Sequence, residues 1–157
     1  MDAASLKLLQ GDLTAQAQEV ERIYTKIRAR AESFRDREET AESLAFQLHN
    51  LYCAFEDLFT VVAEAFENRV SDGPGWHVEL LSRMRTELQG IRPRLVTEEE
   101  YRALNELRAF RHVFRHAYAL ELQPDRLGLV LEQALFMENR TEGMIRRFVE
   151  RCSEGAE

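Results

Sequence analysis

The chain has 157 residues, of which 45% are hydrophobic and 31% are charged, and its formal net charge is -7. A chain of this length has room for one domain, and it contains no apolar run near the roughly 20 residues that cross a membrane, so we expect a soluble protein without a membrane partner. Seven glycines and three prolines are too few for the turns of a β-sandwich or barrel, and the composition therefore predicts an all-α fold.

The first two predicted helices are long. Apolar residues at spacings of three and four predict a helix from about Ser5 to Arg37, within a long N-terminal helical segment 1–38, and a second helix from about Glu39 to Asn68. The apolar stripe of the first helix is thin. The second helix has the strongest core stripe in the chain, which ends at Phe66.

Turn-forming residues separate the following helices. The run SDGPG at 71–75 ends the second helix, and a third helix is predicted from Trp76 to about Gln89. Gly90–Pro93 forms the next connection. We find no linker long enough to divide the chain, so we expect residues 1–157 to form a single helical domain.

The last two predicted helices have clear start signals. Thr97 and Glu100 have the spacing of a capping box, which begins a fourth helix that reaches about Leu122. A proline in the first turn begins a fifth helix, Pro124–Cys152, and residues 154–157 are expected to be a frayed tail. The sequence thus predicts an up-and-down bundle of four long helices and one shorter helix.

The fourth helix places an arginine on its apolar side. With Leu107 at zero on a helical wheel, Phe110, Phe114 and Tyr118 lie within about 80°, and Arg111 lies at about +40° inside this arc. A buried guanidinium without a partner is strongly unfavourable, so Arg111 needs an anionic or hydrogen-bonding group. A carboxylate on a neighbouring helix is the simplest such partner, and a bound anion is the alternative.

A second face of the same helix is basic and rich in imidazole. It lies between about 80° and 180° on the wheel and comprises Arg108, His112, Arg115 and His116. Because the chain as a whole is acidic, any contact with nucleic acid must come from a local basic patch of this kind. Histidines that are merely exposed are the simpler interpretation. The other interpretation is that this face binds a partner or an anion, and phosphate is the anion that clustered arginines bind well.

The stretch 111–118, RHVFRHAY, resembles the signature of HEPN-domain ribonucleases, in which a polar residue follows an arginine and a histidine stands five positions after it. It is most similar to the HepT toxins, in which a tyrosine stands two positions after the histidine. The strings WHVELLSRM at 76–84 and LRAFRH at 107–112 also resemble HepT-like proteins of bacterial toxin–antitoxin pairs. The resemblance covers most of residues 40–150 and implies a HEPN-like bundle.

The resemblance implies a metal-independent endoribonuclease toxin that cleaves RNA as a homodimer, with the two signature helices facing each other. In this scheme His116 is the general base or acid and Arg111 holds the scissile phosphate. His112, Arg108 and Arg115 are auxiliary contacts to RNA or phosphate. Arg111 and His116 lie about 140° apart around a regular helix and about 7.5 Å apart along it, which favours a site shared by two chains.

The resemblance also implies regulation at Tyr118. In the HepT family the antitoxin, a minimal nucleotidyltransferase called MntA, attaches AMP to the matching tyrosine and blocks the site. A bulky anion beside Arg111 would exclude RNA by occupancy and by charge. Because Tyr118 falls on the core-facing arc of the wheel, a tyrosine packed in the core with its hydroxyl at the rim is the alternative.

Two other functions stay open at this point. The chain could be a catalytically silent helical partner of a nucleotidyltransferase, or a structural helical dimer. We expect no cofactor and no DNA partner. The N-terminus lacks the basic and apolar regions of a signal peptide, and two cysteines 99 positions apart are expected to stay reduced, so the prediction is a cytoplasmic protein.

A zinc site is the less favoured alternative for the imidazole-rich face. It would use two pairs of potential ligands four residues apart, His112 with His116 and His49 with Cys53. No HExxH motif is present, and the second pair lies off the apolar stripe of its helix. We therefore predict a site without metal.

Overall fold

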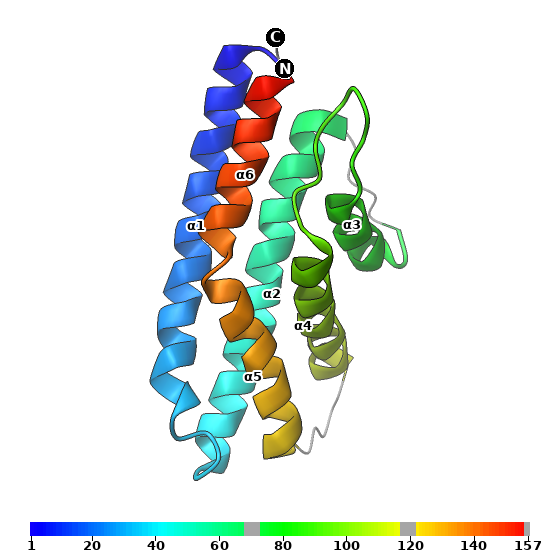
Figure 1. The fold of residues 1–157 in the computed structure, drawn as a ribbon. Coiled ribbons are helices and arrows are strands. Elements are labelled where there is room, and N and C mark those ends of the chain that lie inside the picture. Colours follow the sequence, from blue (N-terminus) through cyan, green and yellow to red (C-terminus); the bar gives the residue numbers. More distant parts are fainter. Residues whose placement is uncertain (68–72, 117–121, 156–157) are drawn as a thin grey trace.

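The chain folds into a helical bundle in a computed structural model that describes residues 1–67, 73–116 and 122–155 (Figure 1). Over these residues there are six helices and no β-strand, which confirms the predicted all-α class. None of these helices is long and apolar enough to cross a membrane. The helices are α1 (Ala3–Ala31), α2 (Glu38–Glu67), α3 (Trp76–Arg85), α4 (Glu98–His116), α5 (Pro124–Glu138) and α6 (Thr141–Glu154).

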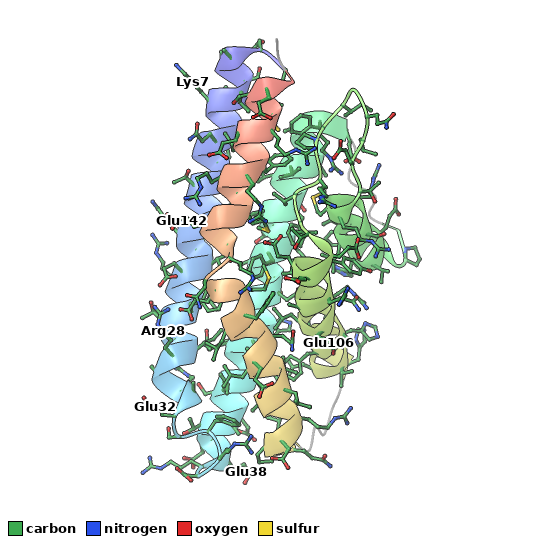
Figure 2. All side chains as sticks on the ribbon, viewed as in Figure 1. Lys7, Arg28, Glu32, Glu38, Glu106 and Glu142 are labelled. Carbon is green, nitrogen blue, oxygen red and sulfur yellow. The ribbon has the colours of Figure 1, made fainter. Side chains whose placement is uncertain are left out.

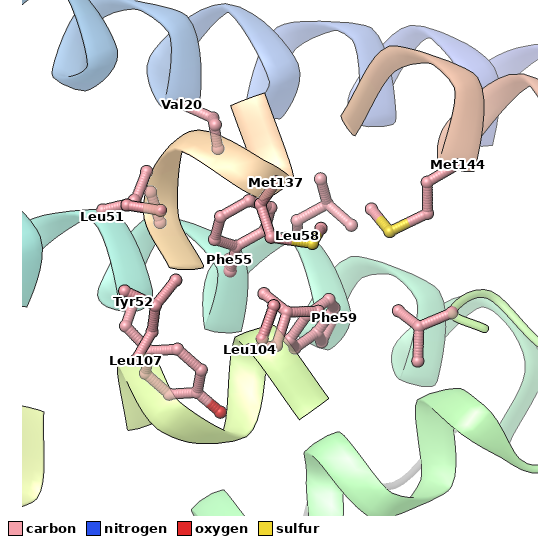
Figure 3. Packing of buried hydrophobic residues seen from close by; sticks show 14 of the residues in the cluster. Val20, Leu51, Tyr52, Phe55, Leu58, Phe59, Leu104, Leu107, Met137 and Met144 are labelled. Carbon is pink, nitrogen blue, oxygen red and sulfur yellow. The ribbon is translucent and has the colours of Figure 1, made fainter. Parts of the chain in front are cut away.

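Helix α2 is the centre of the bundle, as its apolar stripe predicts. It packs against α1, α3, α4 and α5, and its large side chains at spacings of three and four are fully buried. Helices α1 and α2 run antiparallel, while α5 and α6 follow each other along α1 (Figure 1). Figure 3 shows the core that results, in which α2 residues such as Phe55 and Phe59 meet Val20 of α1, Leu104 of α4 and Met137 of α5.

The predicted single helix over 124–152 is wrong, because the chain breaks it into α5 and α6. Helix α5 ends at Glu138, and the Thr141 hydroxyl donates to the carbonyl oxygen of Met137 at 2.8 Å, so this side chain satisfies an acceptor at the break. Apolar periodicity does not reveal the break, since Met137 and Met144 are seven residues apart and both are buried. The interruption lets the C-terminal segment follow the bundle in two straight pieces.

The predicted capping box at the start of α4 is confirmed. The backbone N–H of Thr97 donates to Glu100 Oε2 at 2.8 Å, and the N–H of Glu100 donates to Thr97 Oγ1 at 3.2 Å. Glu100 is buried, and its Oε1 also accepts a hydrogen bond from Arg147 of α6 at 2.6 Å. These contacts fix the point from which α4 extends, and hence the positions of Arg111 and His116, which lie about three and a half and five turns after the start of the helix.

The other helix ends differ by a few residues from the sequence-based boundaries. Helix α1 ends at Ala31 and α3 at Arg85, both earlier than predicted. After α3, Gly90 adopts a left-handed conformation with φ of 72°, as a turn residue there should. The fully buried guanidinium of Arg92 holds this connection in place, because it pairs with Glu67 at 2.7 Å and donates to the carbonyl of Arg83.

Candidate functional site

The candidate site lies on the C-terminal half of α4 and on the part of α2 that faces it (Figure 2). Helix α4 is described to His116, so the structure places five of the six residues singled out in the sequence. Tyr118 lies outside the described residues. The placed residues divide into one that packs against α2 and four on or near the solvent-facing side, namely Arg108, His112, Arg115 and His116.

Arg111 turns its guanidinium into the seam between α4 and α2. Its side chain is only 12% exposed. Nε donates to Cys53 Sγ at 3.2 Å, and the Nη2 atom lies 3.4 Å from Oε1 of Glu56. Partial burial opposes the charged form, but the hydrogen bond to Cys53 and the Glu56 carboxylate outweigh it and raise the pKa of Arg111. The expected partner on a neighbouring helix therefore exists, and it is Glu56.

Glu56 is a buried residue of the candidate site that the sequence did not reveal. Its side chain is 4% exposed, and its two oxygens have different partners: Oε1 faces Arg111, while Oε2 pairs with Nδ1 of His77. His77 is the second residue of α3. The only signal in the sequence is that Arg111 requires some carboxylate, and nothing there singles out Glu56 among the many acidic residues.

His116 and His112 occupy the exposed side of α4. Their ring centroids are 4.5 Å apart, and the Nδ1 atom of His116 lies 2.8 Å from the backbone carbonyl oxygen of His112. A carbonyl oxygen can only accept, so Nδ1 of His116 carries the hydrogen. In the neutral ring Nε2 then has the lone pair, which is the arrangement that a general base needs.

Arg108 and Arg115, which flank the candidate site, differ in solvent exposure. Arg115 is exposed, whereas Arg108 is half-buried and donates from Nε to Asn105 on its own helix at 3.0 Å. Both side chains lie on the same side of α4 as the histidine pair on the helical wheel. The basic face predicted from the sequence is therefore present as a partly solvated strip beside His116.

The structure does not bring Arg111 and His116 together within one chain. Arg111 contacts α2, whereas His116 is exposed and contacts the backbone of its own helix. Between the described residues no hydrogen bond joins the two groups. The helical wheel predicted this separation of Arg111 from His116. The contacts with Cys53 and Glu56 hold Arg111 on the side of α4 that faces α2.

Aromatic rings also pack where α4 meets α2. The Phe114 ring lies 5.9 Å from that of Phe110 and 5.4 Å from that of His49. His49 therefore packs against an aromatic ring, and Cys53 accepts from Arg111. In the part of the chain that the structure describes, no three histidine, cysteine, aspartate or glutamate side chains form a group that could hold a metal ion. His49 and Cys53, the second pair of ligands in the zinc alternative, therefore have other contacts in this structure.

Comparison with known families identifies a matching family model. A family model described as "HepT-like protein" matches residues 43–152, which include most of α2, the helices α3 to α5 and most of α6. The matched segment contains both Glu56 and the whole stretch 111–118, and it leaves out α1. No curated protein and no solved structure matches the chain significantly.

Replacement of Arg111 by methionine should lower the free energy of unfolding by about 1–3 kcal/mol, because Glu56 would keep its buried charge with His77 as the remaining partner. Arg108→Met is the matched control, and it should cost less than about 0.5 kcal/mol because the Arg108 contact is local and partly solvated. Urea unfolding followed by circular dichroism measures both values. Equal losses would contradict this account of Arg111.

Proposed function

Because this chain belongs to the HepT-like family, we propose that it is a HEPN-type endoribonuclease and the toxin of a bacterial toxin–antitoxin pair. The observation that carries the proposal is the pair Arg111 and His116 near the end of α4. One is a guanidinium held in a fixed direction, and the other is an imidazole whose Nε2 is left as an acceptor. A general base and a cation that stabilises the phosphate are groups with which RNA can be cleaved without a metal.

His116 would activate the nucleophile. Its Nε2 takes the proton from a ribose 2′-hydroxyl, and the 2′-oxygen forms a bond to the adjacent phosphorus. The bond from phosphorus to the 5′-oxygen breaks, and the leaving oxygen takes up a proton, which gives a 2′,3′-cyclic phosphate and a 5′-hydroxyl. The hydrogen bond from Nδ1 to the His112 carbonyl orients the ring for this transfer.

Arg111 would hold the phosphate and stabilise the negative charge that develops on it. A guanidinium is charged at any pH at which RNA is cleaved, and the contacts of Arg111 raise its pKa further. The contacts to Cys53 and Glu56 limit its rotation, so the side chain loses less entropy when a phosphate binds. Arg108, Arg115 and His112 lie along the same helix and would attract the RNA strand to an otherwise acidic protein.

A complete site would need a second copy of the chain. Arg111 and His116 lie on different sides of α4, so one helix does not direct both at a single phosphate. If the α4 helices of two copies face each other, His116 of one chain approaches Arg111 of the other. Val113 lies on the exposed side of α4 and is 53% exposed, so it offers an apolar contact for such a dimer.

One observation favours a second candidate, a catalytically silent subunit that binds a nucleotidyltransferase. The Glu56 carboxylate already compensates the charge of Arg111, and a purely structural arginine would be bound in the same way. This candidate predicts that changes at Arg111 alter complex formation and that no RNA is cleaved.

His116→Ala should reduce the cleavage rate of a labelled RNA by at least about 100-fold with EDTA present, since it removes the general base. His116 is exposed, so the melting temperature should stay the same. Arg102→Ala, an exposed change earlier on α4, is the matched control and should retain activity. No cleavage by the unchanged protein would favour the silent subunit, and loss of cleavage on adding EDTA would show that a metal takes part.

Mixing two inactive variants tests whether the site is shared. Arg111→Ala and His116→Ala should each be inactive alone, but after unfolding and refolding together half of the dimers pair one of each. Each mixed dimer has one intact composite site, so about a quarter of the original activity should return. Recovery of no activity, with mixed dimers verified by differential tags, would place the site within a single chain.

We also propose that a nucleotidyltransferase of the MntA type neutralises the protein by adenylylating Tyr118. Incubation with such an enzyme from the neighbouring reading frame and ATP should add AMP to Tyr118, detectable by mass spectrometry. RNA cleavage should then stop, because a bulky anion on the signature stretch would exclude RNA by occupancy and by charge. Tyr118→Phe should stay active and unmodified. Modification at another tyrosine, or inhibition of the phenylalanine variant, would contradict this mode of control.

A further inference from the structure

The carboxylate of Glu56 joins the three helices around the candidate site. It projects from α2, faces Arg111 of α4 with one oxygen and pairs with His77 of α3 through the other. The geometry points to Glu56 as a positioning residue for Arg111. The effect of Glu56 on RNA cleavage rests on the proposed function, whereas its effect on the orientation of the Arg111 side chain does not.

Glu56 and Cys53 together determine how the guanidinium is oriented. Nε of Arg111 donates to Cys53 Sγ, and the Nη2 atom faces Glu56, so two nitrogens are directed at α2. Among the described residues Nη1 has no protein partner. In this arrangement Nη1 would donate to a phosphate, and its direction would depend on the anchoring of Nε and Nη2.

His77 keeps the carboxylate itself from turning. Its Nδ1 contacts Oε2 of Glu56, and its ring packs against Trp76 with centroids 4.1 Å apart at the start of α3. A carboxylate can only accept when it is charged, so Nδ1 carries a hydrogen in this contact. The negative charge of Glu56 is shared between His77 and Arg111. It therefore holds Arg111 in place but cancels only part of the positive potential around the guanidinium.

The chain contains a matched control for the loss of a buried carboxylate. Glu67 lies on the same helix, its side chain is 6% exposed, and it pairs with Arg83 at 2.6 Å and Arg92 at 2.7 Å. These partners lie in α3 and in the connection after it, and neither is in α4. Glu67→Gln therefore removes a similar buried charge without touching Arg111.

Glu56→Gln should lower kcat for RNA cleavage by about 10- to 100-fold, since a small misplacement of a group that holds the reacting phosphate has effects of this size. The Kd for a non-cleavable 2′-deoxy analogue should stay the same or fall, because a negative charge near the phosphate is removed. Glu56→Asp should recover part of kcat, and Glu67→Gln should leave kcat unchanged in the folded protein. Unchanged kcat in Glu56→Gln, or an equal loss in Glu67→Gln, would overturn the inference.

A second measurement does not depend on nuclease activity. In the 15N spectrum of arginine-labelled protein, the Nε–H signal of Arg111 is identified by its absence from the Arg111→Lys variant. Glu56→Gln should speed its hydrogen exchange by at least about tenfold, while Glu67→Gln should leave it unchanged. If the unchanged protein cleaves no RNA, the proposed function fails but this measurement still decides the role of Glu56. An Arg111 signal that Glu56→Gln leaves unaltered would show that Glu56 does not position it.

Discussion

The contact between Glu56 and Arg111 is the interaction on which the arrangement of the site depends. Two charged groups leave water here, and their separate desolvation would be strongly unfavourable without mutual attraction and further hydrogen bonds. Cys53 and His77 supply those hydrogen bonds, one to each partner. As a result the pair links α2, α3 and α4 at one point, and any movement of α3 or α4 on α2 would change the direction of the guanidinium.

The two sides of α4 therefore differ in their surroundings. The side that packs on α2 holds Arg111 against Cys53 and the buried carboxylate of Glu56, where its direction is restricted. The exposed side carries His116, whose ring is held by the preceding turn of its own helix. A chain with a net charge of -7 repels RNA at long range, so any surface that binds RNA must be locally basic. The strip around His116 is locally basic.

Much of the fold follows from local signals that the structure confirms. The stripe of α2 predicts the central helix, the capping box predicts the start of α4, and Gly90 predicts the turn after α3, because each of these signals acts over a few residues. The break between α5 and α6 could not be predicted in this way. The apolar spacing continues from Met137 to Met144, and the side chain of Thr141 satisfies the backbone within the break.

The sequence by itself determined that an arginine lies on the apolar side of α4, that it needs a partner, and that His116 lies far around the helix from it, because helical geometry alone sets these relations. Only the tertiary structure decided that the partner is Glu56. On a wheel centred on Phe55, Glu56 lies about 100° from the middle of the α2 stripe, where a glutamate is usually solvated. Its burial results from the packing of α3 and α4 on that flank, and such packing depends on contacts between residues far apart in the chain.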